Sequence, residues 1–168
     1  MRELLEGLIL IVDDAVEDQR MLTRALRRLG VQNRICCLNA GKEMIGYLKG
    51  DDPYCDRLKY PLPGILFLNL ELPIANGPPL LDWLHGSPMR ENAHLFVYGQ
   101  RRSVSEVERI HNLGADLFLK KPLQEIDLLD LIYRFPESWA IKVLEKPNDS
   151  VVHPSERAIH SNGAQKSS

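Results

Sequence analysis

The side chains best suited to chemistry in this sequence follow short apolar runs of the chain. They are a pair of carboxylates, a carboxamide two residues before a third carboxylate, and a lysine that precedes a proline: Asp13, Asp14, Asn69, Glu71 and Lys121. Paired carboxylates suit a hard cation such as Mg²⁺, which takes oxygen ligands. A lysine opposite them would neutralise an anion such as a phosphoryl group. Whether these groups can act together depends on the elements that position them.

Five short apolar runs alternate with five amphipathic segments along the chain. The runs are bounded by polar residues, as expected of strands that are buried on both faces. They are Leu8–Val12, Arg34–Leu38, Gly64–Leu70, His94–Tyr98 and Asp116–Leu119. Between them, apolar residues recur at intervals of three and four, which predicts helices. These helices are predicted at Val16–Leu29, Lys42–Lys49, Pro78–His85, Ser103–Leu113 and Gln124–Phe135.

This alternation predicts an α/β protein with a parallel sheet, because parallel strands need crossover connections and helices supply them. In a doubly wound sheet, ligands bind beside the carboxyl ends of the strands. The carboxylates, the carboxamide and the lysine would therefore converge at one edge of the sheet. No glycine-rich phosphate-binding motif follows the first strand, which disfavours a dinucleotide-binding fold and a P-loop.

The composition excludes several classes of function. A net charge of −2 argues against non-specific nucleic-acid binding, and no apolar run approaches the roughly 20 residues of a membrane span. The charges in Met1–Gly7 are unlike a secretory leader, and the three cysteines form no Cys-x-x-Cys pair. We expect a cytoplasmic protein without nucleic-acid or membrane partners. We expect one domain over residues 1–146, with its core at 8–135, and a disordered polar tail at 147–168.

Three motifs resemble the bacterial response-regulator receiver domain: Ile9–Asp14 (ILIVDD), Leu66–Gly77 (LFLNLELPIANG) and Gly114–Pro122 (GADLFLKKP). The resemblance implies a (βα)5 flavodoxin-like, doubly wound parallel sheet with strand order 2-1-3-4-5. It also implies a non-enzymatic signalling protein of a two-component phosphorelay, partnered with a sensor histidine kinase or another signalling protein. The loop Asp51–Pro63 and the segment Glu137–Trp139 are similar to single-domain regulators of phytochrome-type kinases.

The resemblance assigns roles to the residues that match the family. Asp14 corresponds to a direct Mg²⁺ ligand and Asp13 to a ligand acting through water. Lys121 corresponds to the lysine that senses phosphate, the backbone carbonyl of Glu71 to a metal ligand, and Phe118 to the aromatic switch position. From the residues alone, the acidic pair could instead favour a helix N-terminus, and the lysine could be solvated or paired with one of these aspartates. We expect the glutamate side chain to face solvent and the phenylalanine to be core.

Two positions depart from the family. Asn69 stands where receivers carry the phosphoacceptor aspartate, and Tyr98 or Gly99, depending on a one-residue shift, stands where they carry a threonine or serine. A carboxamide lacks the anionic oxygen that forms an acyl phosphate, and one carboxylate fewer weakens Mg²⁺ binding. The sequence therefore predicts a degenerate receiver that requires no cofactor. The alternative is a phosphorylatable, Mg²⁺-dependent receiver in which Asn69 is an engineered substitution. A flavodoxin-like enzyme or FMN carrier is a remote third hypothesis.

The last predicted helix carries more apolar residues than one buried stripe requires: Leu128, Leu129, Leu131, Ile132 and Phe135. Either the segment Glu137–Leu144 folds back and buries this helix, or the helix forms a contact between proteins. In the second case, an extended segment leaving the domain would have free backbone groups that pair with its twin. We expect a homodimer through the last helix and this extension.

Overall fold

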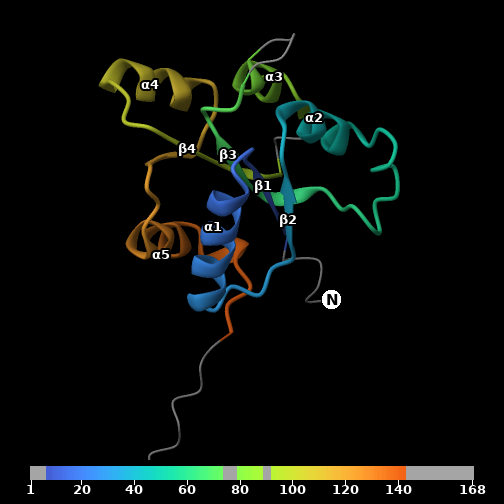
Figure 1. Ribbon diagram of the computed structural model, residues 1–168, viewed down its shortest axis with the longest axis horizontal. Helices are drawn as coiled ribbons and strands as arrows, with labels where there is room; N and C mark the ends of the chain where they lie inside the picture. Colours follow the sequence, from blue (N-terminus) through green and yellow to red (C-terminus); the bar gives the residue numbers. More distant parts are fainter. Residues whose placement is uncertain (1–6, 74–78, 89–91, 143–168) are drawn as a thin grey trace, which may run out of the picture.

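The computed structural model describes residues 7–73, 79–88 and 92–142 and contains a five-stranded sheet between two layers of helices (Figure 1). The strands are β1 (Leu8–Val12), β2 (Ile35–Leu38), β3 (Pro63–Asn69), β4 (His94–Gly99) and β5 (Leu117–Lys120). The helices are α1 (Val16–Arg28), α2 (Gly41–Lys49), α3 (Leu80–His85), α4 (Val104–Asn112), α5 (Glu125–Arg134) and the short 3-10 helix η3 (Pro136–Ser138).

All neighbouring strands of the sheet are parallel, in the order β2-β1-β3-β4-β5. The predicted fold class and strand order are therefore confirmed. Because successive side chains of a strand point to opposite faces, Leu8, Leu10 and Val12 pack in a core under α2, α3 and α4. Ile9 and Ile11 face the second core, which lies under α1 and α5.

The central strands explain why the carboxyl edge of the sheet is fixed. Every residue of β1 is buried, and β3 is buried along nearly all of its length. Because polar residues bound these apolar runs, sliding a strand along the sheet would carry a polar group into the core. Val12 pairs with Leu38 on one side and Leu68 on the other, so the residues that follow these strands meet at one edge.

The predicted boundaries differ from the observed ones by one or two residues at several ends. The largest difference is at α3, which begins at Leu80 rather than Pro78 and makes fewer than two turns. Pro79 is extended and stands just outside the helix, while Pro78 lies outside the described residues. The fifth strand begins at Leu117 rather than Asp116; Asp116 still joins β4, donating from its N–H to the Leu95 carbonyl at 2.8 Å and accepting from the Leu95 N–H on its side chain at 2.7 Å.

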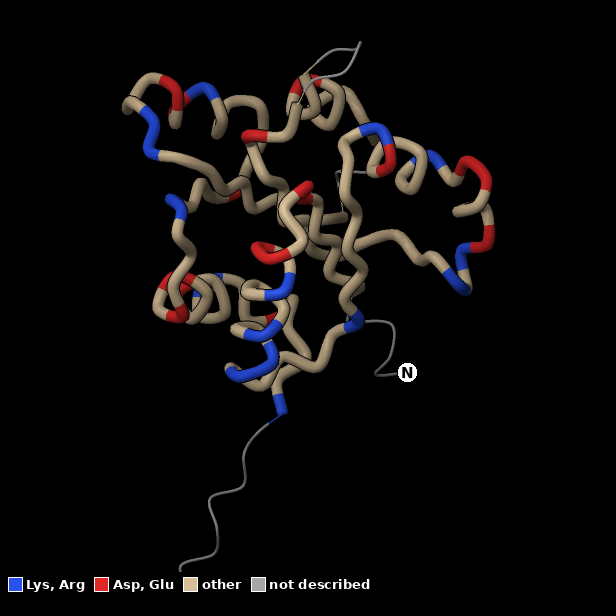
Figure 2. Tube along the Cα trace, in the orientation of Figure 1, with Lys and Arg blue, Asp and Glu red and all other residues tan. Residues whose placement is uncertain are grey.

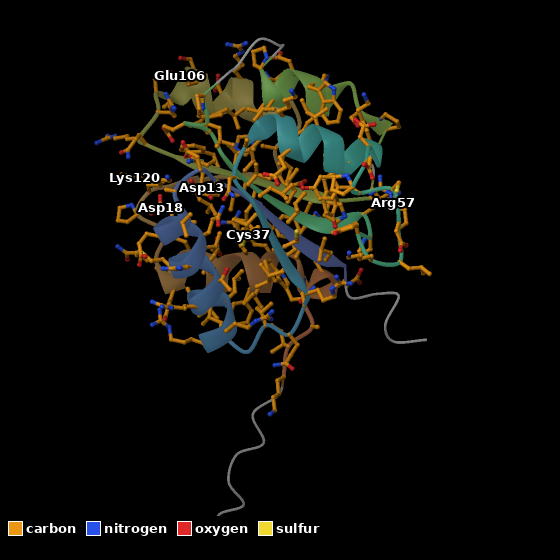
Figure 3. The ribbon with its side chains drawn as sticks, turned by 45° about the vertical axis from the view of Figure 1, so that its right-hand side comes forward. Asp13, Asp18, Cys37, Arg57, Glu106 and Lys120 are labelled. Atoms are coloured by element: carbon orange, nitrogen blue, oxygen red, sulfur yellow. The ribbon has the colours of Figure 1, made fainter. Side chains whose placement is uncertain are left out.

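The predicted long loop before β3 is anchored by an arginine and by aromatic rings. The Arg57 guanidinium, labelled in Figure 3, donates to the carbonyls of Tyr47 and Leu48 at the end of α2, at 2.9 and 2.8 Å. Basic groups at this end of a helix satisfy carbonyls that have no partner within the helix. Tyr54 and Tyr60 pack edge to face at 5.2 Å, beside the buried Tyr47 ring.

The segment after α5 folds back on its own domain as far as the structure describes it. Lys142 donates from its backbone N–H to the Gly30 carbonyl, and Gln32 donates to the Ala140 carbonyl. The Trp139 ring is buried against Phe96, with ring centroids 6.2 Å apart and nearly parallel planes. The expectation that this extension leaves the domain with free backbone groups is therefore wrong for residues up to Lys142. Its remaining predicted residues, 143–144, and the predicted tail at 147–168 lie outside the described residues.

The docked extension also covers only part of α5. Leu128 and Leu131 are buried in the core under α1 and α5, and Ile132 and Phe135 are partly buried there. Ile126 and Tyr133 remain 65% and 76% exposed. Within the described residues, no helix is long and apolar enough to cross a membrane.

Asn33 is predicted to hold the extension in place. Its side chain is 2% exposed, donates to the carbonyls of Gly7 and Ser138, and accepts from the Ala140 N–H at 2.7 Å. We expect Asn33→Ala to lower the free energy of unfolding by about 2–4 kcal/mol, because buried backbone groups lose their partners. Urea denaturation measures this loss. Gln32→Ala is the control, since that exposed side chain makes no such bonds; an equal loss in both variants would contradict the assignment.

Candidate functional site

Asp13 lies at the centre of the carboxyl edge of the sheet, directly after β1, and its side chain is fully buried. Its Oδ1 atom accepts hydrogen bonds from the Ala15 N–H at 2.9 Å and from the Asn69 carboxamide Nδ2 at 3.0 Å. A buried carboxylate is tolerated only when its oxygens are satisfied by donors. The carboxamide of β3 therefore serves as a donor to this aspartate.

The second oxygen of Asp13 is satisfied from β4 and β5. The Tyr98 hydroxyl donates to Oδ2 at 2.7 Å, and the Lys121 ammonium lies 3.9 Å from the same atom. Tyr98 is 2% exposed, and burial, its hydrogen bond to Asp13 and the nearby negative charge raise the pKa of its phenol. The hydroxyl therefore stays protonated and keeps donating. Both oxygens of Asp13 are thus occupied by donors of the protein itself.

Lys121 connects this site to α1. Its ammonium forms a closer ion pair with Asp18, at 2.9 Å, and lies 5.3 Å from the centre of the Tyr98 ring. Figure 3 shows Asp13 and Asp18 at the same edge of the sheet. Lys121 thus pairs with Asp13, one of the two aspartates that the sequence analysis offered as its partner. Its nearest partner, Asp18, was not predicted. The only sequence signal for Asp18 is an acidic residue in the first turn of α1.

Asp14 points away from this network. It is exposed, and within the part of the chain that the structure describes its side chain makes no hydrogen bond or ion pair. The remaining carboxamide atom of Asn69, Oδ1, accepts from the Glu71 N–H at 3.0 Å. Asn69 is 3% exposed, so both ends of its carboxamide are committed to the protein.

Glu71 is exposed, as expected, but its carboxylate is also bonded to the protein. Its Oε1 atom accepts from the Gln100 N–H at 2.9 Å and from the Arg102 guanidinium at 2.8 Å, which ties the end of β3 to the chain after β4. A Cβ atom at Gly99 would lie 2.6 Å from the Glu71 carboxylate. A side chain at Gly99 would therefore displace this contact.

The structure separates the two positions that the sequence left open on β4. Tyr98 points its hydroxyl at Asp13, whereas Gly99 approaches Glu71. Phe118 lies on β5 beside Val97 and packs, partly buried, against the core under α2, α3 and α4. It faces away from the core that contains the Tyr98 ring. This placement agrees with the expectation that Phe118 is a core residue.

One further polar residue of the site was missed by sequence reasoning. Gln19 is 7% exposed, and its carboxamide donates to the backbone carbonyls of Asp13 and Leu38 and to the side-chain oxygen of Asn39. It thus holds the ends of β1 and β2 against the first turns of α1. Its position on the buried side of α1 is the only available signal, and glutamine at such a position resembles an ordinary helix residue.

The site does not suit a resident Mg²⁺ ion as it stands. Asp13 has no free oxygen, Asn69 turns its donor group toward Asp13, and the Lys121 ammonium is nearby. A hard cation requires several unoccupied oxygen ligands. No group of three or more His, Cys, Asp or Glu side chains that could hold a metal occurs among residues 7–73, 79–88 and 92–142. We therefore derive no step through a metal ion.

The fold and this edge define a receiver-like signalling module: a (βα)5 sheet with an acidic pair, a polar β3 residue and a lysine at the carboxyl ends of its strands. The chain belongs to the family described as response regulator receiver domain, whose profile matches residues 9–133. It is thus a receiver domain of two-component signalling. Proteins of this family transmit signals through other signalling proteins.

Individual relatives are distant. The response regulator Rcp1 of Synechocystis is 21% identical over 131 residues, covering 78% of this chain and 87% of that protein. The two-component response regulator 24 of Arabidopsis thaliana is 26% identical over 125 residues, covering 74% and 81%. The structure of the bacteriophytochrome response regulator RtBRR is similar, with a TM-score of 0.69, 23% identity and 87% of each chain covered. The phosphorylated cyanobacterial phytochrome response regulator RcpA has a TM-score of 0.64, 20% identity and coverage of 80% and 94%.

Tyr98→Phe removes one donor from Asp13 without changing the size of the ring. We expect the free energy of unfolding to fall by about 1–3 kcal/mol, because the buried carboxylate loses a hydrogen bond that water cannot replace. Tyr133→Phe is the matched control, since that ring is 76% exposed, and we expect it to change stability by less than about 0.5 kcal/mol. Chemical denaturation compares the two. Equal stability of wild type and Tyr98→Phe would rule out this role for the hydroxyl.

Proposed function

We propose that this receiver is degenerate and acts without phosphorylation, because its own side chains occupy the positions that a cation and a phosphoryl group would need. The observation that carries the proposal is the occupation of both Asp13 oxygens by donors of the protein: Ala15 N–H, Asn69 Nδ2 and the Tyr98 hydroxyl. The Lys121 ammonium adds a positive charge 3.9 Å from Oδ2. In this arrangement the carboxamide acts as a fixed hydrogen-bond donor. The hydrogen bonds at this edge of the sheet then do not depend on a change of charge at residue 69.

The chemistry of the β3 residue supports the same proposal. Acyl phosphate formation requires a carboxylate oxygen as nucleophile, and Asn69 offers only an amide whose two polar atoms are already bonded. Glu71 is the nearest carboxylate in sequence, but Arg102 and the Gln100 N–H hold it on the other side of the strand end. Neither residue is placed to replace the missing aspartate.

The output of such a receiver would be protein–protein contact in the cytoplasm. Exposed apolar side chains lie on α4 and α5, at Val104 (77%), Ile126 (65%) and Tyr133 (76%), and these are available for such a contact. The relatives named for phytochrome systems support a phytochrome-type histidine kinase as partner. A homodimer through α5 stays a prediction, now without a contribution from the docked residues up to Lys142.

The proposal predicts that acetyl phosphate with Mg²⁺ leaves the protein unmodified. The physical reason is the missing nucleophile at Asn69, together with the pairing of Glu71. Intact-mass spectrometry followed by peptide mapping measures the result, and a phosphorylatable receiver treated in parallel shows that the reagent is active. A stoichiometric phosphoryl adduct on Asn69, Glu71 or the acidic pair would overturn the degenerate assignment.

Restoring the carboxylate should make the protein dependent on a cation. Asn69→Asp replaces a donor 3.0 Å from Asp13 with a second buried negative charge. We expect it to lower stability by about 3–5 kcal/mol without Mg²⁺, as for an unpaired buried charge. Millimolar Mg²⁺ should then raise the Tm of Asn69→Asp but not that of wild type, because binding to the folded state stabilises it.

Asn112→Asp, at the exposed end of α4, controls for the change in net charge. Thermal melting with and without Mg²⁺ compares the three proteins. The proposed site chemistry fails if wild type gains as much stability from Mg²⁺ as Asn69→Asp does.

A further inference from the structure

A pocket of about 680 Å³ lies between α1 and α5 and borders the site, since Tyr98 and Lys121 form part of its lining. Figure 1 shows the two helices side by side on one face of the sheet. Volumes of about 300–1,000 Å³ are typical of sites that enclose small molecules. The space is therefore large enough for a compact organic ligand.

The floor of the pocket is apolar, whereas charged and polar side chains form much of its walls. Leu22 and Ala25 contribute from α1, Leu128 from α5 and Leu123 from the chain that precedes α5. Of these, Leu22, Ala25 and Leu128 are buried in the core beneath the pocket, so the floor is part of the folded domain. The exposed Met21 lies at the rim. Such a surface binds the apolar body of a ligand.

Two ion pairs lie at opposite ends of this pocket, one between α1 and the chain after β5 and one between α1 and α5. Lys121 bonds Asp18 near the start of α1, and Arg28 bonds Glu125 of α5 at 2.7 Å. Asp18 and Arg28 are ten residues apart on α1, which corresponds to about 15 Å along a helix axis. The α1 residues that line the pocket fall within this span, from Asp18 to Arg28. The dimensions therefore favour a compact molecule.

Between these two pairs lies one cation without a partner. Arg24 lines the pocket, and among the described residues its guanidinium forms no ion pair or hydrogen bond. Figure 2 shows the basic positions along α1 beside α5. The other charged groups of the lining compensate each other in the pairs Lys121–Asp18 and Arg28–Glu125. An anionic group on a ligand would therefore complement Arg24.

We propose that the α1–α5 pocket binds a small amphipathic anion, with its carboxylate, sulfonate or phosphate on Arg24 and its apolar body against Leu22, Ala25 and Leu128. This ligand site borders the Asp13 network, since Tyr98 and Lys121 also line it, but Arg24 and the apolar floor take no part in that network. Guanidinium groups bind such oxyanions by two parallel hydrogen bonds. The buried floor supplies the area that holds the rest of the molecule.

Fluorescence titration with two dyes of the same skeleton tests the proposal on the full chain at physiological salt. Anilinonaphthalene sulfonate carries an anionic group, and N-phenylnaphthylamine lacks it. We expect saturable, one-to-one binding of the sulfonate dye, about tenfold weaker in Arg24→Ala and largely restored in Arg24→Lys. The neutral dye should bind both variants equally.

Arg20→Ala is the matched control, because Arg20 lies one turn earlier on the same helix, is exposed, and does not line the pocket. We expect this variant to bind both dyes with affinities within twofold of those of wild type.

Amide chemical shifts in the ¹H–¹⁵N spectrum should change at Met21–Ala25 and Leu123–Leu128 when the sulfonate dye binds. Absence of saturable binding, equal weakening by Arg20→Ala and Arg24→Ala, or shift changes confined to another face would each overturn the proposal. Unchanged Tm values exclude unfolding as the cause of dye binding.

Discussion

The arrangement at the carboxyl edge of the sheet depends on one constraint, the burial of the Asp13 carboxylate. A charge that is fully removed from water is stable only when donors surround it. Here hydrogen bonds come from the chain after β1, from β3 and from β4, at Ala15, Asn69 and Tyr98. The Lys121 ammonium, just after β5, adds a positive charge 3.9 Å away. The carboxylate thus joins the ends of the four strands β1, β3, β4 and β5. Losing any one donor leaves the same buried charge less well satisfied.

Much of this edge could be predicted from sequence, because apolar runs such as Leu8–Val12 are long enough to place strands and the polar residue after each one. Three features could not. Whether Tyr98 or Gly99 occupies the threonine or serine position of the family depends on the face to which each residue points, and a one-residue shift reverses that face. The contact of Lys121 with Asp18 depends on the reach of two side chains 103 residues apart. Gln19 resembles any polar helix residue until its partners are known.

The C-terminal extension shows a second limit of sequence patterns. Residues after α5 alternate as a strand would, and this correctly indicated extended backbone at Trp139–Ile141. The alternation did not indicate which groups the backbone of this segment would bond to. Its partner is Asn33, whose buried carboxamide, after α1, bonds Ser138 and Ala140 across more than one hundred residues. Single-sequence periodicity carries no information about such a partner, so the free edge expected for dimer formation is used within the domain.

In receivers with an aspartate on β3, the family resemblance implies that a change of charge at that residue alters the edge of the sheet. In the function we propose, Asn69 removes that route, and a signal reaches the network through a member that solvent or a ligand can touch. Asp13, Asn69 and Tyr98 are 0%, 3% and 2% exposed, whereas the Lys121 side chain is 19% exposed. Lys121 also lines the α1–α5 pocket and is held there by Asp18. Of these four side chains, the lysine is therefore the one through which binding at the surface can alter the buried carboxylate.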